Sequence, residues 1–323
     1  MDPARLFAAS RVLIVAGKGG VGKSTMSAAL ARTAARAGIS TLLIRLTPGG
    51  PISRLFAQPE LTTLEQTLHP GGGPGGDADV RGRLVTPDKA LAEYLADHGL
   101  ARITRRLAST GAIDVVTTAA PGIRDLLVLG RVKAMETMKA ADLIVLDAPA
   151  AGHAVSFLQS PTGLRRAVGA GPIATQADDV LAMLADPERC RVMLVTLAEE
   201  TPVNEVIETA FALEDEIGIA LGPVIVNGLV EVPEGLDGDL DALLAENAPK
   251  LSAHDVAALR DAAAFRMRWA SRQREQVARL SDSLPLTQLM TPQLFTSEPG
   301  PRELETLADS LTSEINKLTE DDA

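Results

Sequence analysis

GKGGVGKST, residues 17–25, lies between a short apolar run and an alanine-rich segment with helical spacing. The apolar run, VLIVA at residues 12–16, contains β-branched residues and predicts a strand, and the following helix is expected to continue to about Gly38. Glycines in such a loop let successive backbone N–H groups turn inward around a phosphate, and the helix N-terminus adds a favourable dipole. A chance glycine-rich turn would lack the matching strand and helix, so the sequence predicts a phosphate loop.

The residues of this loop have expected roles toward a bound nucleotide. Lys23 would reach the β and γ oxygens, the Ser24 hydroxyl would ligate Mg²⁺, and Thr25 would hydrogen-bond the α-phosphate. The full set of loop residues expected to contact nucleotide is Gly17, Lys18, Gly19, Gly20, Val21, Gly22, Lys23, Ser24 and Thr25. The loop therefore predicts a nucleotide site with Mg²⁺, in which Lys23 is also a catalytic residue.

Lys18 gives the loop a second lysine, directly after its first glycine. The form KGGVGKST, residues 18–25, resembles the deviant phosphate loop (deviant Walker A) of a class of ATPases. That class includes the arsenite-pump ATPases, the tail-anchored-protein targeting ATPases, MinD, ParA and the nitrogenase iron protein. The resemblance implies that Lys18 crosses a dimer interface and acts catalytically on the partner's nucleotide. A solvated loop lysine is the alternative, but a cation beside a phosphate site favours the functional interpretation.

DAPAAGH, residues 147–153, follows an apolar run that begins at Asp142 and is expected to end as a strand at Asp147. It resembles the DTAPTGH second switch of the arsenite and tail-anchored branches, with Asp147, Gly152 and His153 at the same spacing. The resemblance implies that Asp147 belongs to the Mg²⁺ site and senses the loss of the γ-phosphate. Taken alone, the aspartate would also suit a helix cap and the Gly-His pair a turn.

The first switch departs from the family pattern. The predicted strand Ser40–Leu46 leads into TPGGP at residues 47–51, where those branches carry an Asp-Pro pair whose aspartate positions or activates the attacking water. Thr47 stands at that place. A threonine hydroxyl can orient a water but does not take its proton at neutral pH, so we predict slow hydrolysis or dependence on another group.

The base is expected to bind after two later strands. The apolar run Leu221–Asn227 predicts a strand ending at Asn227, where the family binds adenine. An asparagine amide pairs with the N6 and N7 edge of adenine, which favours ATP. The loop Leu289–Phe295, expected after another short strand, resembles the segment that flanks the adenine ring. The resemblance therefore adds two residues to the site, Pro292 and Gln293.

The resemblance covers about Val12–Leu311 and implies an α/β fold, a P-loop NTPase with a mostly parallel, doubly wound sheet. It implies one domain over residues 1–323, with an α-helical subdomain inserted above the nucleotide edge. The segments expected to contribute to that subdomain are about 85–140, 153–187 and 231–283. The final helix, residues 302–318, has one apolar stripe between acidic flanks, so we expect it to pack against the sheet rather than to bind anionic lipid.

Composition excludes several other classes of site. The chain has 31 Lys and Arg against 42 Asp and Glu, a net charge of −11, which opposes binding to nucleic acid or anionic lipid. No apolar run approaches the roughly 18 residues of a membrane span. The single cysteine, Cys190, cannot by itself form an intrachain disulfide, a zinc clasp, an iron–sulfur site or a cysteine trio for arsenite. We expect a cytoplasmic protein without nucleic-acid partners or stable membrane insertion, and without zinc, iron–sulfur cluster or cysteine-bound arsenite.

The expected function is a Mg²⁺-dependent, slowly hydrolysing ATPase that acts as a nucleotide-switched dimer and couples ATP to a partner or client protein. The dimer would be a homodimer or a heterodimer with a paralogous ATPase. Thr47 motivates an alternative, a catalytically weak scaffold subunit that completes a heterodimer with an active paralogue. A positioning ATPase of the ParA or MinD type is a further alternative, against which the net charge argues.

Overall fold

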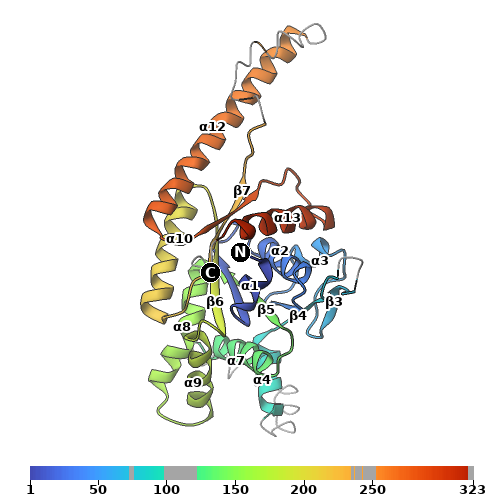
Figure 1. Ribbon diagram of the computed structural model, residues 1–323. Coiled ribbons are helices and arrows are strands. Elements are labelled where there is room, and N and C mark those ends of the chain that lie inside the picture. The colour runs from blue at the N-terminus through green and yellow to red at the C-terminus, as the bar shows by residue number, and fades with distance from the viewer. Residues whose placement is uncertain (73–75, 98–121, 234–235, 237–241, 243–251, 319–323) are drawn as a thin grey trace.

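The computed structural model describes residues 1–72, 76–97, 122–233, 236, 242 and 252–318. Within these ranges eight strands form one sheet: β1 Val12–Gly17, β2 Thr41–Arg45, β3 Gln66–His69, β4 Val80–Leu84, β5 Leu143–Ala150, β6 Cys190–Leu197, β7 Val224–Leu229 and β8 Gln288–Pro292. Across the sheet they follow the order β3-β4-β2-β5-β1-β6-β7-β8 (Figure 1). The edge strand β3 runs antiparallel to β4, and the other neighbouring pairs are parallel.

Helices cover both faces of this sheet. One face carries α1 Pro3–Ala8, α2 Lys23–Arg36, α3 Ile52–Leu55 and α13 Pro301–Lys317. The other carries α4 Pro87–Asp97, α7 Ile123–Thr137, α8 Ala151–Ala167, α9 Pro172–Leu184 and α10 Glu200–Ala212, which continues into the π-helical turn η1 Leu213–Ile217. In β1, Val12 and Ile14 face one layer while Leu13 and Val15 face the other, and all four are buried. The predicted mostly parallel, doubly wound α/β fold is therefore confirmed.

The helix α2, which follows the phosphate loop, is buried along most of its length. It packs against β1, β2 and β5 on one side and against α13 on the other. Five of its alanines have no exposed surface and let these elements approach closely: Ala28, Ala29, Ala31, Ala34 and Ala35. The buried Arg32 bonds Asp77 at 2.7 Å and Glu305 of α13 at 2.6 Å, which fixes α13 against α2.

The final helix α13 buries the apolar stripe that its sequence predicts. The buried members of the stripe are Leu304, Leu307, Leu311, Ile315 and, just past the helix, Leu318. They pack against α2 and the edge strand β8. Within the described ranges, no helix is both long and apolar enough to cross a lipid bilayer.

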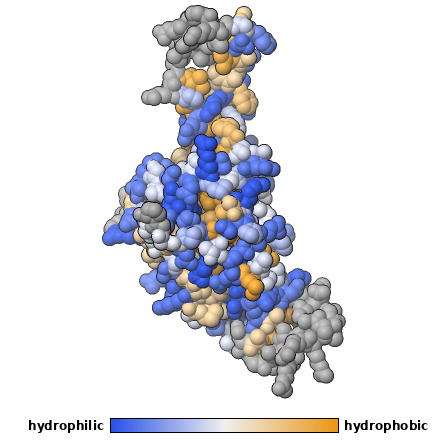
Figure 2. Space-filling model, turned by 90° about the vertical axis from the view of Figure 1, so that its right-hand side faces the viewer, coloured by the Kyte–Doolittle hydropathy of each residue, from blue (hydrophilic) through white to orange (hydrophobic). Residues whose placement is uncertain are grey.

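A long helix extends away from the sheet (Figure 1). This helix, α12 Ala253–Ser283, begins with a capping box between Ser252 and Asp255 and contacts α10 and β7. Apolar side chains gather on the projecting part (Figure 2), where Leu259 and Phe265 are 46% and 60% exposed. The helices from 85–140 and 153–187 instead lie against one face of the sheet. That these segments form a single subdomain stays a prediction, and parts of 85–140 and 231–283 lie outside the described residues.

Three predicted strand limits are wrong. β5 continues past Asp147 to Ala150, because Ala150 pairs with Gly17 across a bulge in β1. β7 continues past Asn227 to Leu229. The last strand was expected to end before residues 289–295. Instead β8 covers Gln288–Pro292, where it pairs with β7.

Candidate functional site

The glycines of the phosphate loop are required by its geometry. Gly17, Gly20 and Gly22 have φ of 154°, 91° and 92°, values that side chains disfavour. A Cβ on Gly17 would lie 2.2 Å from the carbonyl oxygen of Val195 on the neighbouring strand β6. A Cβ on Gly22 would lie 2.3 Å from the side-chain nitrogen of Asn227. The loop therefore passes too close to the backbone of β6 for a larger residue at position 17, and a larger residue at position 22 would displace the Asn227 side chain.

Lys23 is the first residue of α2 and turns back toward the loop. Its Nζ donates a hydrogen bond to the carbonyl oxygen of Lys18 at 2.8 Å. Burial lowers the pKa of Lys23, and the nearby Asp147 carboxylate opposes that shift. A phosphate would give this ammonium group a charged acceptor, which binds more strongly than a carbonyl. Thr25 lies partly buried in the same first turn of the helix.

The structure brings Ser24 and Asp147 together, although 123 positions separate them in the sequence. The Ser24 hydroxyl donates to Asp147 Oδ2 at 2.7 Å. A third residue joins them, because Arg45 Nη1 lies 3.1 Å from Asp147 Oδ2 and 3.1 Å from Ser24 Oγ. Asp147 is only 6% exposed, and burial raises its pKa against the lowering effects of the Ser24 hydrogen bond and the Arg45 charge.

These residues do not fit Mg²⁺ as they are arranged. A hydroxyl and a carboxylate have the oxygen chemistry that Mg²⁺ prefers. The Ser24 hydroxyl donates to Asp147 Oδ2, and Arg45 Nη1 donates to both Ser24 Oγ and Asp147 Oδ2, so the guanidinium contacts both groups that would hold a metal. A guanidinium therefore stands where the cation would bind. The assignment of Mg²⁺ to Ser24 and Asp147 stays a prediction.

Lys18 is paired within its own chain. Its Nζ lies 2.6 Å from Oε1 of Glu205 on α10, and the two side chains are 38% and 36% exposed. A pair this exposed contributes about 0–1 kcal/mol to stability, so its separation costs little. The arrangement leaves Lys18 at the surface of the site, held by a contact that is easily exchanged.

The predicted adenine residues lie at the same edge of the sheet. Asn227 Nδ2 donates to the carbonyl oxygen of Val21 in the phosphate loop at 2.9 Å, and Asn227 Oδ1 accepts from Thr291 Oγ1 at 3.0 Å. Each end of the amide keeps a second hydrogen-bonding position for a base. Pro292 ends β8, and the Gln293 backbone N–H donates to the carbonyl oxygen of Leu229 at 2.8 Å. The adenine roles of these residues stay predictions.

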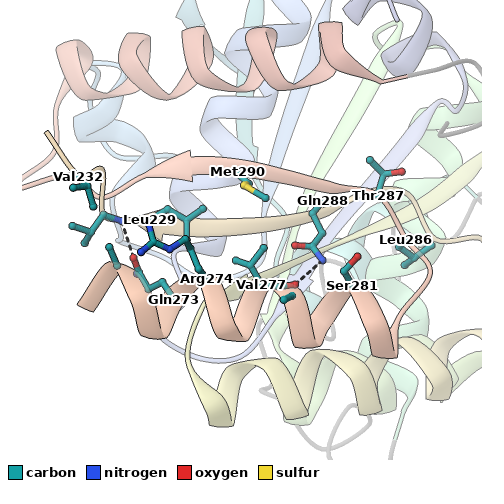
Figure 3. A pocket seen from close by; sticks show the side chains of 13 residues that line it. Leu229, Val232, Gln273, Arg274, Val277, Ser281, Leu286, Thr287, Gln288 and Met290 are labelled. Atoms are coloured by element: carbon teal, nitrogen blue, oxygen red, sulfur yellow. Dashed lines mark hydrogen bonds between the residues drawn. The ribbon is translucent and has the colours of Figure 1, made fainter. Parts of the chain in front are cut away.

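A separate cavity of about 670 Å³ lies between α12 and the strands β7 and β8 (Figure 3). Gln273 of α12 lines this cavity and bonds the backbone at the end of β7. Its Nε2 donates to the Gly228 carbonyl oxygen, and its Oε1 accepts a hydrogen bond from the Val230 N–H. The lining includes Arg274 and Met290 but no residue of the phosphate loop. The two hydrogen bonds of Gln273 therefore anchor α12 to the end of β7, and the cavity was not expected from the sequence.

Sequence reasoning missed three residues of the site, namely Arg45, Glu205 and Thr291. Arg45 is the one with a usable signal: it ends β2, and in the parallel pairing of β2 with β5 it stands opposite Asp147. Glu205 contacts Lys18 and Thr291 contacts Asn227, across 187 and 64 positions of the sequence. No local sequence pattern predicts either contact.

Known proteins resemble this chain over much of its length. The family model for anion-transporting ATPases matches residues 10–171. The ATPase BagA of Mycobacterium tuberculosis is 32% identical over 254 residues, 74% of this chain and 73% of that protein. An arsenical pump-driving ATPase of Escherichia coli is 26% identical over 255 residues, and a putative one of Halobacterium salinarum is 26% identical over 243. These two matches cover 72% and 68% of this chain but only 42% and 36% of those longer proteins. The predicted resemblance is thereby confirmed, and the chain belongs to the anion-transporting ATPase family.

Proposed function

We propose that this protein is an ATP-binding, slowly hydrolysing ATPase that acts as a nucleotide-switched dimer and couples ATP to a partner or client protein. Membership of the family supports the ATP-binding and ATPase part of the proposal. The observation that carries it is the phosphate loop at the carboxyl edge of a parallel sheet, with Lys23, Ser24 and Asp147 gathered at the N-terminus of α2. We also propose that it works in the cytoplasm.

The slow turnover follows from the first switch. Thr47 is exposed on the loop after β2, and its hydroxyl has no means of accepting a proton from water at neutral pH. Its backbone carbonyl oxygen accepts a hydrogen bond from Arg45 Nε at 2.6 Å, so the loop is held by its backbone. Mg²⁺ is not part of the proposed steps, because Arg45 already contacts both groups that would hold it, Ser24 Oγ and Asp147 Oδ2.

The dimer is tested through Lys18. In the proposed dimer, Lys18 leaves Glu205 and contacts the nucleotide of the partner subunit. Lys18→Ala is expected to keep the nucleotide affinity but to lower dimer-dependent ATP turnover by about 10-fold or more, because a cation acting in trans on transferring phosphate has large effects. The measurements are nucleotide titration, light scattering with and without ATP, and steady-state turnover against protein concentration.

Glu205→Gln is the matched control, since it removes the in-chain partner and leaves Lys18 in place. We expect this variant to dimerise with ATP and to turn over at least as fast as the native protein. Equal turnover by the native protein and Lys18→Ala, with no dependence on protein concentration, would contradict the dimer proposal while leaving ATP binding intact.

A second candidate is a catalytically weak scaffold that completes a heterodimer with an active paralogous ATPase. Thr47 and the Arg45 contact with Asp147 favour it, because both remove groups that hydrolysis would use. If it is correct, the purified chain binds ATP but shows turnover close to background, and adding a co-encoded relative restores turnover. Robust hydrolysis by the purified chain alone would exclude the scaffold.

A further inference from the structure

The guanidinium of Arg45 is held in place by contacts with three other residues and by a loop that lies against it. Arg45 ends β2, and its side chain is only 12% exposed. Its Nη1 contacts Ser24 Oγ and Asp147 Oδ2, both at 3.1 Å, and its Nε donates to the carbonyl oxygen of Thr47 at 2.6 Å. Gly50 closes over it with φ of 92°, where a Cβ would lie 2.4 Å from Arg45 Nη2. Three hydrogen bonds and a glycine-dependent loop thus fix this cation beside the phosphate loop.

The positive charge of Arg45 offsets the negative charge of the Asp147 carboxylate at this site. A buried carboxylate at the N-terminus of α2 would repel the phosphates of a nucleotide unless a cation lies between them. A bound divalent metal is the usual cation in phosphate sites. Here Asp147 already has a positive partner in Arg45, independently of any ion from solution.

The guanidinium also has capacity for phosphate. Within the described part of the chain, Nη2 makes no hydrogen bond, while Nη1 and Nε hold Ser24, Asp147 and Thr47. Arginine donates in a planar fork that matches phosphate oxygens, and it stays charged at any physiological pH. One face of the group can therefore neutralise the carboxylate while Nη2 donates to a phosphate oxygen.

We propose that Arg45 is the resident cation of this nucleotide site, so that the chain binds ATP without Mg²⁺. The inference rests on the proposed nucleotide binding and adds to it the charge that accompanies the phosphates. Under this proposal Mg²⁺ is dispensable for ATP binding by this chain.

The test is the affinity for a fluorescent ATP analogue, titrated in Mg²⁺ and in EDTA. For the native protein we expect dissociation constants within about 3-fold of each other under the two conditions. Arg45→Gln removes the salt-bridge partner of Asp147, so the affinity of the variant in EDTA should fall by about 10-fold or more and should recover when Mg²⁺ is added. Circular dichroism confirms that the variant is folded.

The double variant Arg45→Gln/Asp147→Asn separates charge from packing. Removing the carboxylate as well should restore most of the affinity that Arg45→Gln loses in EDTA, which loss of packing alone would not permit. Native binding that weakens 10-fold or more in EDTA would overturn the role of Arg45 and leave the proposed ATP binding standing. Lack of binding by the native protein under both conditions would overturn both proposals. If Arg45→Gln does not fold, the comparison of the native protein in Mg²⁺ and EDTA still decides.

Discussion

Lys23→Ala is expected to weaken ATP binding by about 100-fold or more, equivalent to about 3 kcal/mol. The ammonium group of Lys23 lies inside the phosphate loop, where it donates a hydrogen bond to the carbonyl oxygen of Lys18. The charge of the nearby Asp147 raises the pKa of Lys23, against the larger lowering effect of burial. A bound triphosphate would replace the carbonyl with charged oxygens, and alanine removes the donor altogether. Isothermal titration with ATP measures the loss directly.

Lys317→Ala is the matched control for this variant. Lys317 ends α13, is 68% exposed and, among the residues that the structure describes, pairs only with Glu314 of the same helix, so its loss should leave ATP affinity unchanged. The unfolding temperature of Lys23→Ala should stay close to that of the native protein without nucleotide and should no longer rise when ATP is added. Tight ATP binding by Lys23→Ala would mean that the phosphate loop is not the nucleotide site.

Gly17→Ala is expected to lower the free energy of unfolding by about 3 kcal/mol. The added Cβ would lie 2.2 Å from the carbonyl oxygen of Val195, and both atoms belong to adjacent central strands. The backbone cannot yield there without breaking the pairing of β1 with β6, which lies at the centre of the sheet. Urea unfolding followed by circular dichroism measures the change, and a loss of soluble protein would point the same way.

Gly20→Ala separates this clash from the cost of backbone conformation. Gly20 also has positive φ, 91°, but a Cβ there would have no neighbour within 4 Å. We expect it to cost about 1 kcal/mol, the strain of a left-handed residue alone. If Gly17→Ala unfolds at the same urea concentration as Gly20→Ala, the close approach of the loop to β6 is not a constraint on folding.

The centre of the fold could be predicted because its strands are short apolar runs buried on both faces. Val12–Ala16 and the run after Asp142 have this form, and both lie in the interior of the sheet. The stripe of α13 could be predicted for the corresponding reason, since one helical face carries its apolar residues. In each case the pattern lies within one segment, a continuous apolar run for the strands and one apolar face for the helix.

The strand β4, which lies between β2 and the edge strand β3, carries no such pattern. β4 contains Arg81, Gly82 and Arg83, which favour a loop by composition. Arg83 is nevertheless buried, because its guanidinium bonds Glu93 of α4 at 3.0 Å. A buried arginine becomes tolerable only once its partner is in place, and that partner is fixed by tertiary packing.

The candidate site shows the same division. The phosphate loop and Asp147 are recognisable because motif and spacing lie within single segments. The contact of Arg45 with Asp147 joins two strands 102 positions apart and depends on β2 and β5 being parallel neighbours. Local sequence therefore predicts a phosphate site here, whereas the contact that brings Arg45 to Asp147 depends on strand order.

The close packing of α2 determines which parts of the protein can move when nucleotide binds. Its alanines lie in contact with the sheet and α13, so a shift of this helix would require the repacking of a dense interior. The exposed loop at residues 47–50 and the surface contact of Lys18 with Glu205 meet no such resistance. When phosphate binds, we therefore expect these loops to move first, in the nanosecond to microsecond range, while α2 keeps its position against the sheet.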